Sequence, residues 1–376
     1  MGKRSRRLLI TTTVPQTLDA FVVPQVPYLL KAGWQVMLVA SPDGRSVPGV
    51  SGVTTQEIRM TRSISPIPDA RAWVEWLLLL RKAKPDVLLG STPKAGLLAM
   101  TAGAVAGVEH RIFLHRGARW ETLRGNRRLL IMELERLTMT AATANLAVSD
   151  SLADLVFSEG LVKSRPIVLG HGGSAGVDLD RFSVAPVTHD RPATIGFVGR
   201  ISRDKGVDVA LAVLSALRQS FANPTLIVAG ELDPNDPIDE STKQRLEWDS
   251  DVRLLGRVED IPGFMHGIDV LVFPSRREGL PNVVIEAAAC GVPTVAWDVT
   301  GVRDAISDGR TGSLVPFGRV ALFNRQVAYW VNRRNPSTAR QCREWSTRFA
   351  RDELAGTLVR FLDNLLEPSS ANSDLA

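Results

Sequence analysis

The stretch VLVFPSRREGLPNVVIEAAACGVPTVAW, residues 270–297, decides the fold of this chain. It opens with an apolar run, Val270–Phe273, passes through a charged loop and continues into the apolar segment Asn282–Ala289. A second apolar run, Thr294–Trp297, follows directly after a glycine, a valine and a proline. A strand, a helix and a second strand in this order predict a βαβ unit, whose two strands lie parallel in one sheet.

The same alternation of strand-like and helical segments runs through both halves of the chain. Further strands are expected at 8–13, 35–40, 86–90, 111–115, 145–148, 194–198, 225–229 and 252–255. Helices are expected at 18–32, 70–82, 94–106, 126–142, 149–158 and 207–219, and over most of 319–366. Apolar strands that alternate with helices predict parallel sheets covered on both faces, so the fold class is α/β with doubly wound sheets.

A break between residues 171 and 192 divides this pattern into two domains. The segment contains several glycines and prolines and little hydrophobic periodicity, which is typical of a linker. We therefore expect an N-terminal domain at 1–173, a linker at 174–192, a second domain at 193–345, a C-terminal helix at 346–366 and a disordered tail at 367–376.

The composition is that of an ordinary globular protein. Of the 376 residues, 44% are hydrophobic and 23% are charged, which excludes collagen-like, rod-like and wholly disordered chains. The two cysteines, Cys290 and Cys342, are too few for a disulfide framework or a cysteine-rich zinc site. No apolar run is long enough for a membrane span, and Leu8–Ile10 is too short for a signal peptide. We expect a soluble, cytoplasmic protein.

The positive charge is concentrated in the first half of the chain. The formal net charge is +5, and residues 1–185 carry 23 lysines and arginines against 15 acidic residues. Such an imbalance favours a partner with phosphates or an anionic surface, and ordinary solvated surface charge is the alternative.

Two loops that follow predicted strands carry candidate site residues. The loop Gly199–Gly206 contains Arg200 and Lys205, whose charges suit phosphate oxygens; a plain exposed loop is the alternative. The loop after Phe273 contains Glu278, and Glu286 lies eight residues further on, within an apolar helix. A carboxylate among apolar neighbours is costly unless it is hydrogen-bonded, which suggests a ligand for Glu286.

These motifs resemble the retaining, nucleotide-sugar-dependent glycosyltransferases of family 4. Glu278 and Glu286 form the family's Glu-x₇-Glu pattern, with Phe-Pro-Ser before it, Glu-Gly-Leu-Pro within it and Glu-Ala-x-Ala-Cys-Gly-Val-Pro at its end. The loop Gly199–Gly206 resembles the family's donor-phosphate loop. The first half is similar to glycosyltransferases of bacterial capsule, O-antigen and exopolysaccharide synthesis, through Ser65-Pro66, Thr92–Leu97 and Arg116-Gly117.

The resemblance implies the GT-B fold, with two facing Rossmann-like domains, a cleft between them and a C-terminal helix that crosses back to the first, acceptor-binding domain. It implies that Arg200 and Lys205 neutralise the departing donor diphosphate and that Glu286 accepts hydrogen bonds from the donor ribose. Glu278 would hold hydroxyls of the transferred sugar, so the catalytic set is Glu278, Arg200 and Lys205. Backbone N–H groups around Gly279 and Leu280 would complete the donor site, and no protein nucleophile is implied.

The first half departs from the family pattern at two places. The segment Thr11–Gln16 has no glycine where many members have a glycine-rich loop. At the position of a His-Gly pair the chain reads His115-Arg116-Gly117, and we favour Arg116 over His115 as the site residue. The acceptor-side candidates are Arg116, His115, Lys94 and Arg119.

Neither a metal nor another cofactor is expected, and nucleic acid is not an expected partner. Asp178-x-Asp180 and Asp249-x-Asp251 match a metal-binding motif of another glycosyltransferase fold, but surface charge or helix capping is the favoured interpretation. The scattered histidines do not have zinc-site spacing.

The leading hypothesis is transfer of a hexosyl or N-acetylhexosaminyl group from a nucleotide sugar to a polyprenyl-diphosphate-linked glycan. A soluble small-molecule acceptor is the first alternative, and a non-catalytic scaffold subunit is the second. Peripheral binding to the anionic inner leaflet of the plasma membrane is expected from a basic cluster: Lys3, Arg4, Arg6, Arg7, Arg116, Arg119, Arg124, Arg127 and Arg128, with Trp120 among them. The alternative is that these arginines form salt bridges with Glu121, Glu133 and Glu135, or that they bind only the donor.

Overall fold

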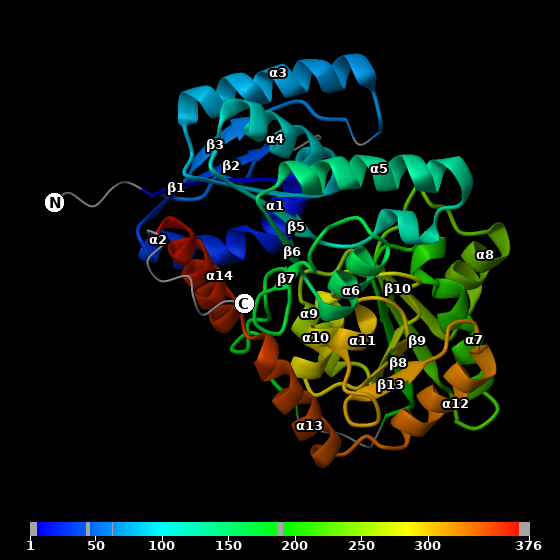
Figure 1. Cartoon of the computed structure of the whole chain (residues 1–376). Coiled ribbons are helices and arrows are strands. Elements are labelled where there is room, and N and C mark those ends of the chain that lie inside the picture. Colours follow the sequence, from blue (N-terminus) through cyan, green and yellow to red (C-terminus); the bar gives the residue numbers. More distant parts are fainter. Residues whose placement is uncertain (1–5, 43–45, 62, 186–190, 368–376) are drawn as a thin grey trace. The chain divides into compact units, whose positions relative to one another are not determined.

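The computed structural model describes residues 6–42, 46–61, 63–185 and 191–367. The chain forms two compact units, of which the first comprises residues 1–176 and 351–376 and the second residues 177–350 (Figure 1). The predicted linker spans the first division between the units, and its residues 186–190 lie outside the described part of the chain. The same holds for residues 368–376 of the predicted tail and for Lys3 and Arg4.

The first unit is built on a parallel sheet of seven strands in the order β3-β2-β1-β4-β5-β6-β7. The strands are β1 Arg6–Thr11, β2 Trp34–Ala40, β3 Thr54–Glu57, β4 Val87–Ser91, β5 His110–His115, β6 Ala144–Ala147 and β7 Ile167–Val168. The central strands are apolar on both sides, because helices cover both faces of the sheet.

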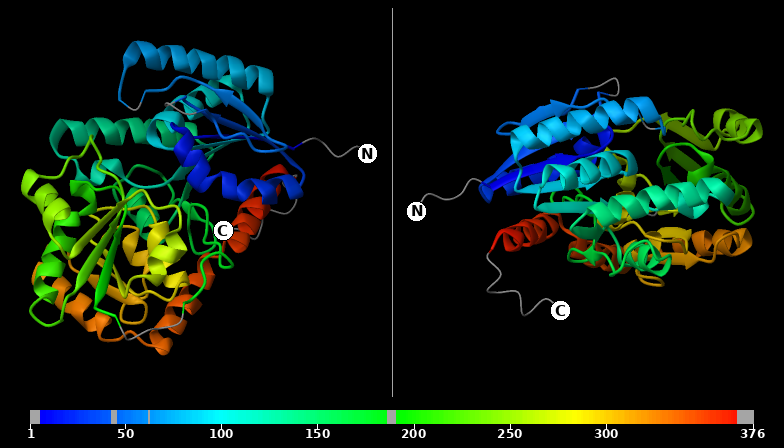
Figure 2. Two further views of the ribbon diagram at one scale, coloured as in Figure 1. Left: turned by 180° about the vertical axis from the view of Figure 1, so that it is seen from behind. Right: turned by 45° about the horizontal axis from the view of Figure 1, so that its top comes forward.

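On one face of this sheet, α3 (Pro66–Ala83), α4 (Pro93–Ala106) and α5 (Gly125–Ala141) lie side by side (Figure 2). Elsewhere the unit contains α1 (Pro15–Phe21), α2 (Val26–Lys31), α6 (Asp150–Ser158) and α14 (Arg351–Leu366), with short 3₁₀ turns η1 (Val23–Gln25) and η2 (Arg119–Thr122). Helix α14 packs on α2 and places Leu362 in the core with Trp34, so the end of the chain is part of the first unit.

The segment predicted as one helix over 18–32 is divided in the structure. Helix α1 ends at Phe21, the turn η1 follows, and α2 begins at Val26. Pro24 and Pro27 explain the division, because proline lacks the backbone N–H that a helix interior requires. Pro27 sits in the first turn of α2, where proline is tolerated.

The second unit contains a parallel sheet of six strands in the order β10-β9-β8-β11-β12-β13. Its strands are β8 Thr194–Val198, β9 Thr225–Ala229, β10 Val252–Gly256, β11 Val270–Phe273, β12 Thr294–Trp297 and β13 Gly312–Val315. Its helices are α7 Val207–Leu217, α8 Glu240–Trp248, α9 Ile261–His266, α10 Asn282–Ala289, α11 Val302–Ala305, α12 Val320–Val331 and α13 Pro336–Ser346, with 3₁₀ turns η3 Arg203–Lys205 and η4 Thr347–Phe349. Helices α7, α8 and α12 bury their apolar residues in one core with the strands.

Candidate active site

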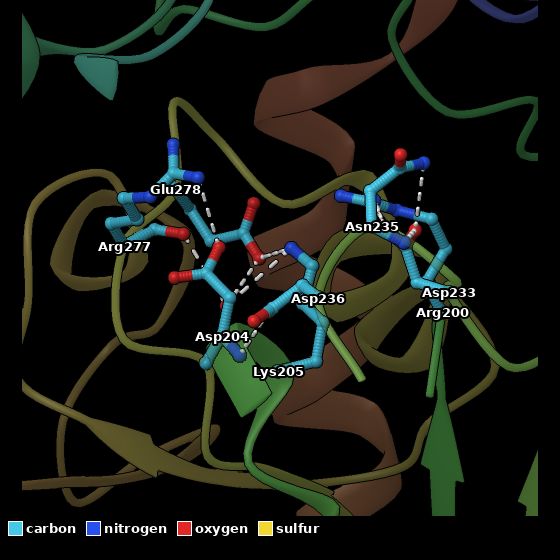
Figure 3. Close-up of polar contacts among 9 residues, drawn as sticks. Arg200, Asp204, Lys205, Asp233, Asn235, Asp236, Arg277 and Glu278 are labelled. Atoms are coloured by element: carbon cyan, nitrogen blue, oxygen red, sulfur yellow. Dashed lines mark hydrogen bonds and ion pairs between the residues drawn. The ribbon is translucent and has the colours of Figure 1, made fainter. Parts of the chain in front are cut away.

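The strand order of the second unit brings three loops together. Strand β8 lies between β9 and β11, and all three strands run parallel. Their carboxyl ends therefore share one edge of the sheet, which is where doubly wound sheets bind ligands. The loops after β8, β9 and β11 carry the charged side chains that Figure 3 labels.

The loop after β8 is held close to the loop after β11 by a glycine. Gly206 has φ +72° and directly precedes α7, and a Cβ at this position would overlap the carbonyl oxygen of Pro274. Arg276 N donates to Asp204 O at 2.9 Å and joins the same two loops a second time. Glycine is thus required both by the left-handed backbone and by the close approach.

Lys205 and Glu278 form an ion pair between Nζ and Oε1 at this edge (Figure 3). Ser275 Oγ donates to the same carboxylate oxygen at 2.7 Å. Both charged side chains are largely withdrawn from water, with 19% and 16% exposure. Lys205 and Glu278, which were predicted from sequence to belong to one site, are thus in direct contact. Because their charges are opposite, the net charge of this part of the site is close to zero.

Arg200 pairs with Asp233, a residue of the loop after β9. The Arg200 side chain is 64% exposed, whereas the Asp233 side chain is 6% exposed, and its carboxylate also accepts the Asn235 backbone N–H at 3.0 Å. Burial raises the pKa of Asp233, but Asn235 and Arg200 together outweigh burial and lower that pKa below its ordinary value. The carboxylate therefore remains charged and anchors an arginine whose head faces solvent.

Asp233 was not among the residues predicted from the sequence, and neither was the pair formed by Asp204 and Arg277 at 3.1 Å. The position of Asp233 in the sequence could have indicated it as a site residue, because Asp233 follows strand β9 just as Arg200 follows β8. Gly230 adds a second signal: a Cβ there would overlap the Gly199 carbonyl oxygen, so these two loops touch. The two loops are neighbours because β8 and β9 are adjacent in the sheet. That strand order cannot be predicted from a single sequence.

Gly279 and Leu280 lie between Glu278 and helix α10. Leu280 is buried, and Gly301, in the loop after β12, packs against the backbone of this segment. Gly301 has φ +75°, and a Cβ there would overlap the Gly279 carbonyl oxygen. The backbone around Glu278 is therefore fixed by a glycine contact from a neighbouring strand end.

Glu286 lies in the second turn of α10 and is half-buried. One turn further on, burial and the Glu286 charge raise the pKa of the Cys290 thiol to about 12. The structure thus places the two glutamates of the sequence pattern on consecutive elements, one in the loop and one in the helix. The donor-binding roles predicted for Glu286, Gly279 and Leu280 stay predictions.

In the first unit, the segment Thr11–Gln16, which has no glycine where many family members have a glycine-rich loop, is held by contacts between hydroxyl groups. Thr13 Oγ1 lies 2.8 Å from Thr92 Oγ1, and Thr13 N donates to Thr92 Oγ1 at 2.9 Å. These contacts join the loops after β1 and β4, and Thr92 has the unusual φ of 71° for a β-branched residue. Lys94, in the first turn of α4, is ion-paired with Asp69.

His115 and Arg116 differ sharply at the end of β5. His115 is buried against the edge of Phe113, and burial lowers its pKa to about 3 although Asn145 partly offsets this effect, so the imidazole is neutral at pH 7. Arg116 lies over the Phe21 ring at 5.0 Å and lines a cavity of the first unit. Arg119, in η2, is exposed.

The expected basic cluster is partly engaged in contacts within the first unit. Arg128 pairs with Glu159 at 2.7 Å, which differs from the three glutamates considered from sequence. Trp120 is buried and donates Nε1 to Glu135 at 2.9 Å, so its indole is not on the surface. Arg124 and Arg127 are exposed at the start of α5.

Among the described residues, no group of three or more His, Cys, Asp or Glu side chains could hold a metal ion. Asp249 and Asp251 both pair with Arg218, and Asp178 accepts the Arg181 backbone N–H at 3.1 Å. In the same part of the chain, every helix is too short or too polar to cross a bilayer.

Comparison with known proteins decides the family. A model described as "Glycosyl transferase 4-like domain" matches residues 21–172, and one described as "Glycosyl transferases group 1" matches residues 192–332. The capsular polysaccharide biosynthesis glycosyltransferase CapM of Staphylococcus aureus is 32% identical over 318 residues, which cover 82% of this chain and 83% of CapM. The chain belongs to glycosyltransferase family 4.

This family 4 glycosyltransferase is also similar to a further relative in sequence and to a solved structure in fold. The UDP-Gal:alpha-D-GlcNAc-diphosphoundecaprenol alpha-1,3-galactosyltransferase of Escherichia coli is 25% identical over 285 residues, which cover 70% of this chain and 71% of the relative. HepE from Anabaena, solved in complex with UDP, has a TM-score of 0.75 at 17% identity and covers 96% of this chain and 100% of its own. The predicted GT-B fold class and the predicted enzyme class, a retaining hexosyl-transferring glycosyltransferase, are confirmed.

Proposed function

We propose that this glycosyltransferase moves a hexosyl or N-acetylhexosaminyl group from a nucleotide-sugar donor to a polyprenyl-diphosphate-linked glycan. The product would be an intermediate of a bacterial surface polysaccharide. The observation that carries the donor half of the proposal is the charged edge where Arg200, Lys205 and Glu278 gather. The acceptor half is supported by the activities named for the capsular and undecaprenol-linked relatives.

The two ion pairs suggest how this edge would receive a donor diphosphate. Arg200 and Lys205 already have carboxylate partners, Asp233 and Glu278, so the unliganded edge holds balanced charge. Diphosphate oxygens would take over the N–H donors of both cations, because charge-assisted hydrogen bonds to phosphate are strong. Lys205 would then release Glu278 toward hydroxyls of the sugar.

Transfer breaks the bond between the anomeric carbon and the phosphate oxygen and forms a bond from that carbon to the acceptor oxygen. Retention requires both oxygens on the same face of the sugar ring. Negative charge builds on the leaving diphosphate, where Arg200 and Lys205 would stabilise it most in the transition state. The departing phosphate oxygen would accept the proton of the acceptor hydroxyl, which balances charge without a protein nucleophile.

Other residues would position the donor. Glu286, half-buried on α10, would accept hydrogen bonds from the ribose, and N–H groups near Gly279 and Leu280 would contact sugar or phosphate. On the acceptor side we propose Arg116 and Arg119 as the cationic contacts. Lys94 is secondary, because Asp69 already holds its ammonium group.

Peripheral association with the cytoplasmic leaflet would rest on the exposed part of the basic cluster. Arg119, Arg124 and Arg127 are exposed, and α5 also exposes the apolar residues Leu130 and Leu137. Each basic residue near an anionic leaflet contributes on the order of 1 kcal/mol, so three give weak, salt-sensitive binding. Arg128 adds less, because Glu159 already neutralises it.

The reaction is tested with a panel of nucleotide sugars against two acceptors of one glycan, a short-chain polyprenyl-diphosphate conjugate and a soluble conjugate that lacks the lipid. We expect transfer to the lipid-linked glycan with retained anomeric configuration. Transfer only to the soluble conjugate would favour the small-molecule alternative. Absence of both transfer and donor hydrolysis would favour the scaffold alternative.

Membrane association is tested separately by sedimentation with anionic and neutral liposomes at low and high salt. The variant Arg119→Ser, Arg124→Ser, Arg127→Ser should lose binding to anionic liposomes. A matched control changes three exposed arginines of the second unit: Arg253, Arg310 and Arg319. Binding that ignores lipid charge and survives the first triple change would reject this surface.

A further inference from the structure

Two ion pairs of opposite direction join the loops after β8 and β11 in the second unit. Asp204 and Lys205 are consecutive residues of the first loop, and Arg277 and Glu278 are consecutive residues of the second. Lys205 pairs with Glu278, and Arg277 Nη2 lies 3.1 Å from Asp204 Oδ2 (Figure 3). Each loop thus contributes one cation and one carboxylate. The first pair has a role in the proposed reaction, and the second pair has none so far.

The carboxylate of Asp204 lies in an unfavourable place for a donor diphosphate. Asp204 directly precedes Lys205, which would bind the diphosphate, and like charges at such short range repel each other. Asp236 adds a further carboxylate, because its Oδ2 accepts the Asp204 backbone N–H at 2.8 Å. Among the described residues, Arg277 is the one cation within ion-pair distance of Asp204. Without Arg277, the loop that receives the phosphates would carry an unneutralised carboxylate.

The surroundings of Arg277 strengthen its effect on Asp204. The Arg277 side chain is 27% exposed, and the Asp204 side chain is 18% exposed. The Nε atom of Arg277 is shielded from solvent and has no hydrogen-bond partner in the described part of the chain. Charges that are partly withdrawn from water interact more strongly than exposed charges. The neighbouring Arg276 is exposed and contacts Asp204 through its backbone N–H, so its side chain provides a reference charge in the same loop.

We propose that Arg277 is a positioning residue of the donor site, which neutralises Asp204 so that a diphosphate can replace Glu278 on Lys205 without meeting a free carboxylate. Donor binding would open the Lys205 pair, while the Arg277 pair stays closed. The inference rests on the proposed transfer from a nucleotide sugar, and it adds a residue that acts through Asp204 rather than by touching the donor.

The test is calorimetry of the full-length protein with whichever of UDP, GDP, ADP and dTDP the wild type binds best. Arg277→Met should weaken binding about tenfold at low salt, because it leaves the Asp204 carboxylate unpaired beside the phosphates. The ratio of wild-type to variant affinity should shrink as salt is added, because ions screen the repulsion between Asp204 and phosphate. A purely structural role of Arg277 would not give this dependence on salt.

A second change at Asp204 separates neutralisation from packing. The double variant Arg277→Met, Asp204→Asn has no carboxylate left to neutralise, so its affinity should return to within about threefold of wild type. Asp204→Asn alone should bind the nucleotide at least as tightly as wild type, because Arg277 then adds free positive charge. Arg277→Lys keeps the charge and should keep most of the affinity.

Arg276→Met is the matched control. It removes the same charge from the same loop but leaves Asp204 paired, so affinity should change by less than about twofold. Thermal unfolding of each variant verifies that it is folded. If Arg277→Met does not fold, Asp204→Asn still decides, because weaker binding by this variant would overturn the proposal.

Two other results would also reject the role of Arg277. One is wild-type affinity in Arg277→Met, and the other is a double variant that binds as weakly as Arg277→Met alone. Either result would leave the donor reaction standing, because the wild type would still bind its nucleotide. A wild type that binds none of the four nucleotides would reject the proposed function, and this inference with it.

Discussion

Cations at two comparable strand ends, one in each unit, have opposite surroundings. In the second unit, Lys205 and Arg200 each lie against a carboxylate, and the carboxylates belong to loops of neighbouring strands. In the first unit, the corresponding strand-end arginine, Arg116, lies against an aromatic ring and apolar walls. A paired cation can exchange its partner for a ligand at small net cost, whereas an unpaired one gains a partner only when a ligand binds. The comparison shows that a strand-end cation is neutralised by carboxylates in the second unit, whereas Arg116 in the first unit lies against an aromatic ring.

Among the changes that test this comparison, Lys205→Met should have the largest effect on activity. Loss of the cation should lower kcat by about 10²–10³-fold, because the charge that develops on the leaving phosphate loses a fixed partner. Initial rates with a saturating donor measure this effect. Lys163→Met, at an exposed position of the first unit, is the control and should leave kcat unchanged. A Lys205 variant within threefold of wild type would remove the lysine from the reaction.

Gly301→Ala tests whether the backbone around Glu278 requires its glycine contact. A Cβ at Gly301 would overlap the Gly279 carbonyl oxygen, and φ is +75°. Gly309→Ala is a close control, since Gly309 has φ +74° with nothing near the added Cβ. Both changes should cost about 1–2 kcal/mol of left-handed strain, but only Gly301→Ala should also lower kcat. Equal losses in both variants, in thermal unfolding and in kcat, would contradict the proposed role of the contact.

Glu135 should make the folding stability of the first unit depend on pH. Burial raises its pKa to about 7, although Trp120 and Arg119 partly offset burial. The folded state therefore holds a proton that the unfolded state releases near pH 4.5, so stability should fall as pH rises from about 4.5 to 7. Glu135→Gln should remove this decline and gain on the order of 1–3 kcal/mol at pH 7.5. Urea unfolding at pH 5, 6 and 7.5 checks it, and parallel curves for both proteins would refute the assignment.

The smallest effect concerns divalent metal ions. Arg200 and Lys205 already supply the positive charge that a metal ion would otherwise bring to a diphosphate. Transfer activity should therefore remain within twofold after EDTA treatment. Strict dependence on Mg²⁺ or Mn²⁺, restored when the ion is added back, would show that the phosphate contacts are assigned wrongly.

Much of this architecture could be predicted from the sequence, because strands and helices follow local hydrophobic patterns. The loops with Arg200, Lys205 and Glu278 were placed after the correct strands for the same reason. The partners of those residues could not be predicted: Asp233 reaches Arg200 only through the order of strands β9 and β8, a long-range property. The cavity that Arg116 lines likewise includes residues of α14, which belongs to the first unit although it comes from the far end of the chain.

The central claim, that a donor diphosphate replaces Glu278 on Lys205, is tested most directly by calorimetry of nucleoside diphosphates with Glu278→Gln. We use whichever of UDP, GDP, ADP and dTDP the wild type binds best. The variant frees Lys205 from its competing carboxylate, so the nucleotide should bind several-fold more tightly, while single-turnover transfer should fall. Glu286→Gln, which leaves the Lys205 pair intact, should instead weaken nucleotide binding. Nucleotide affinity that is unchanged or reduced in Glu278→Gln would contradict the exchange of partners on Lys205.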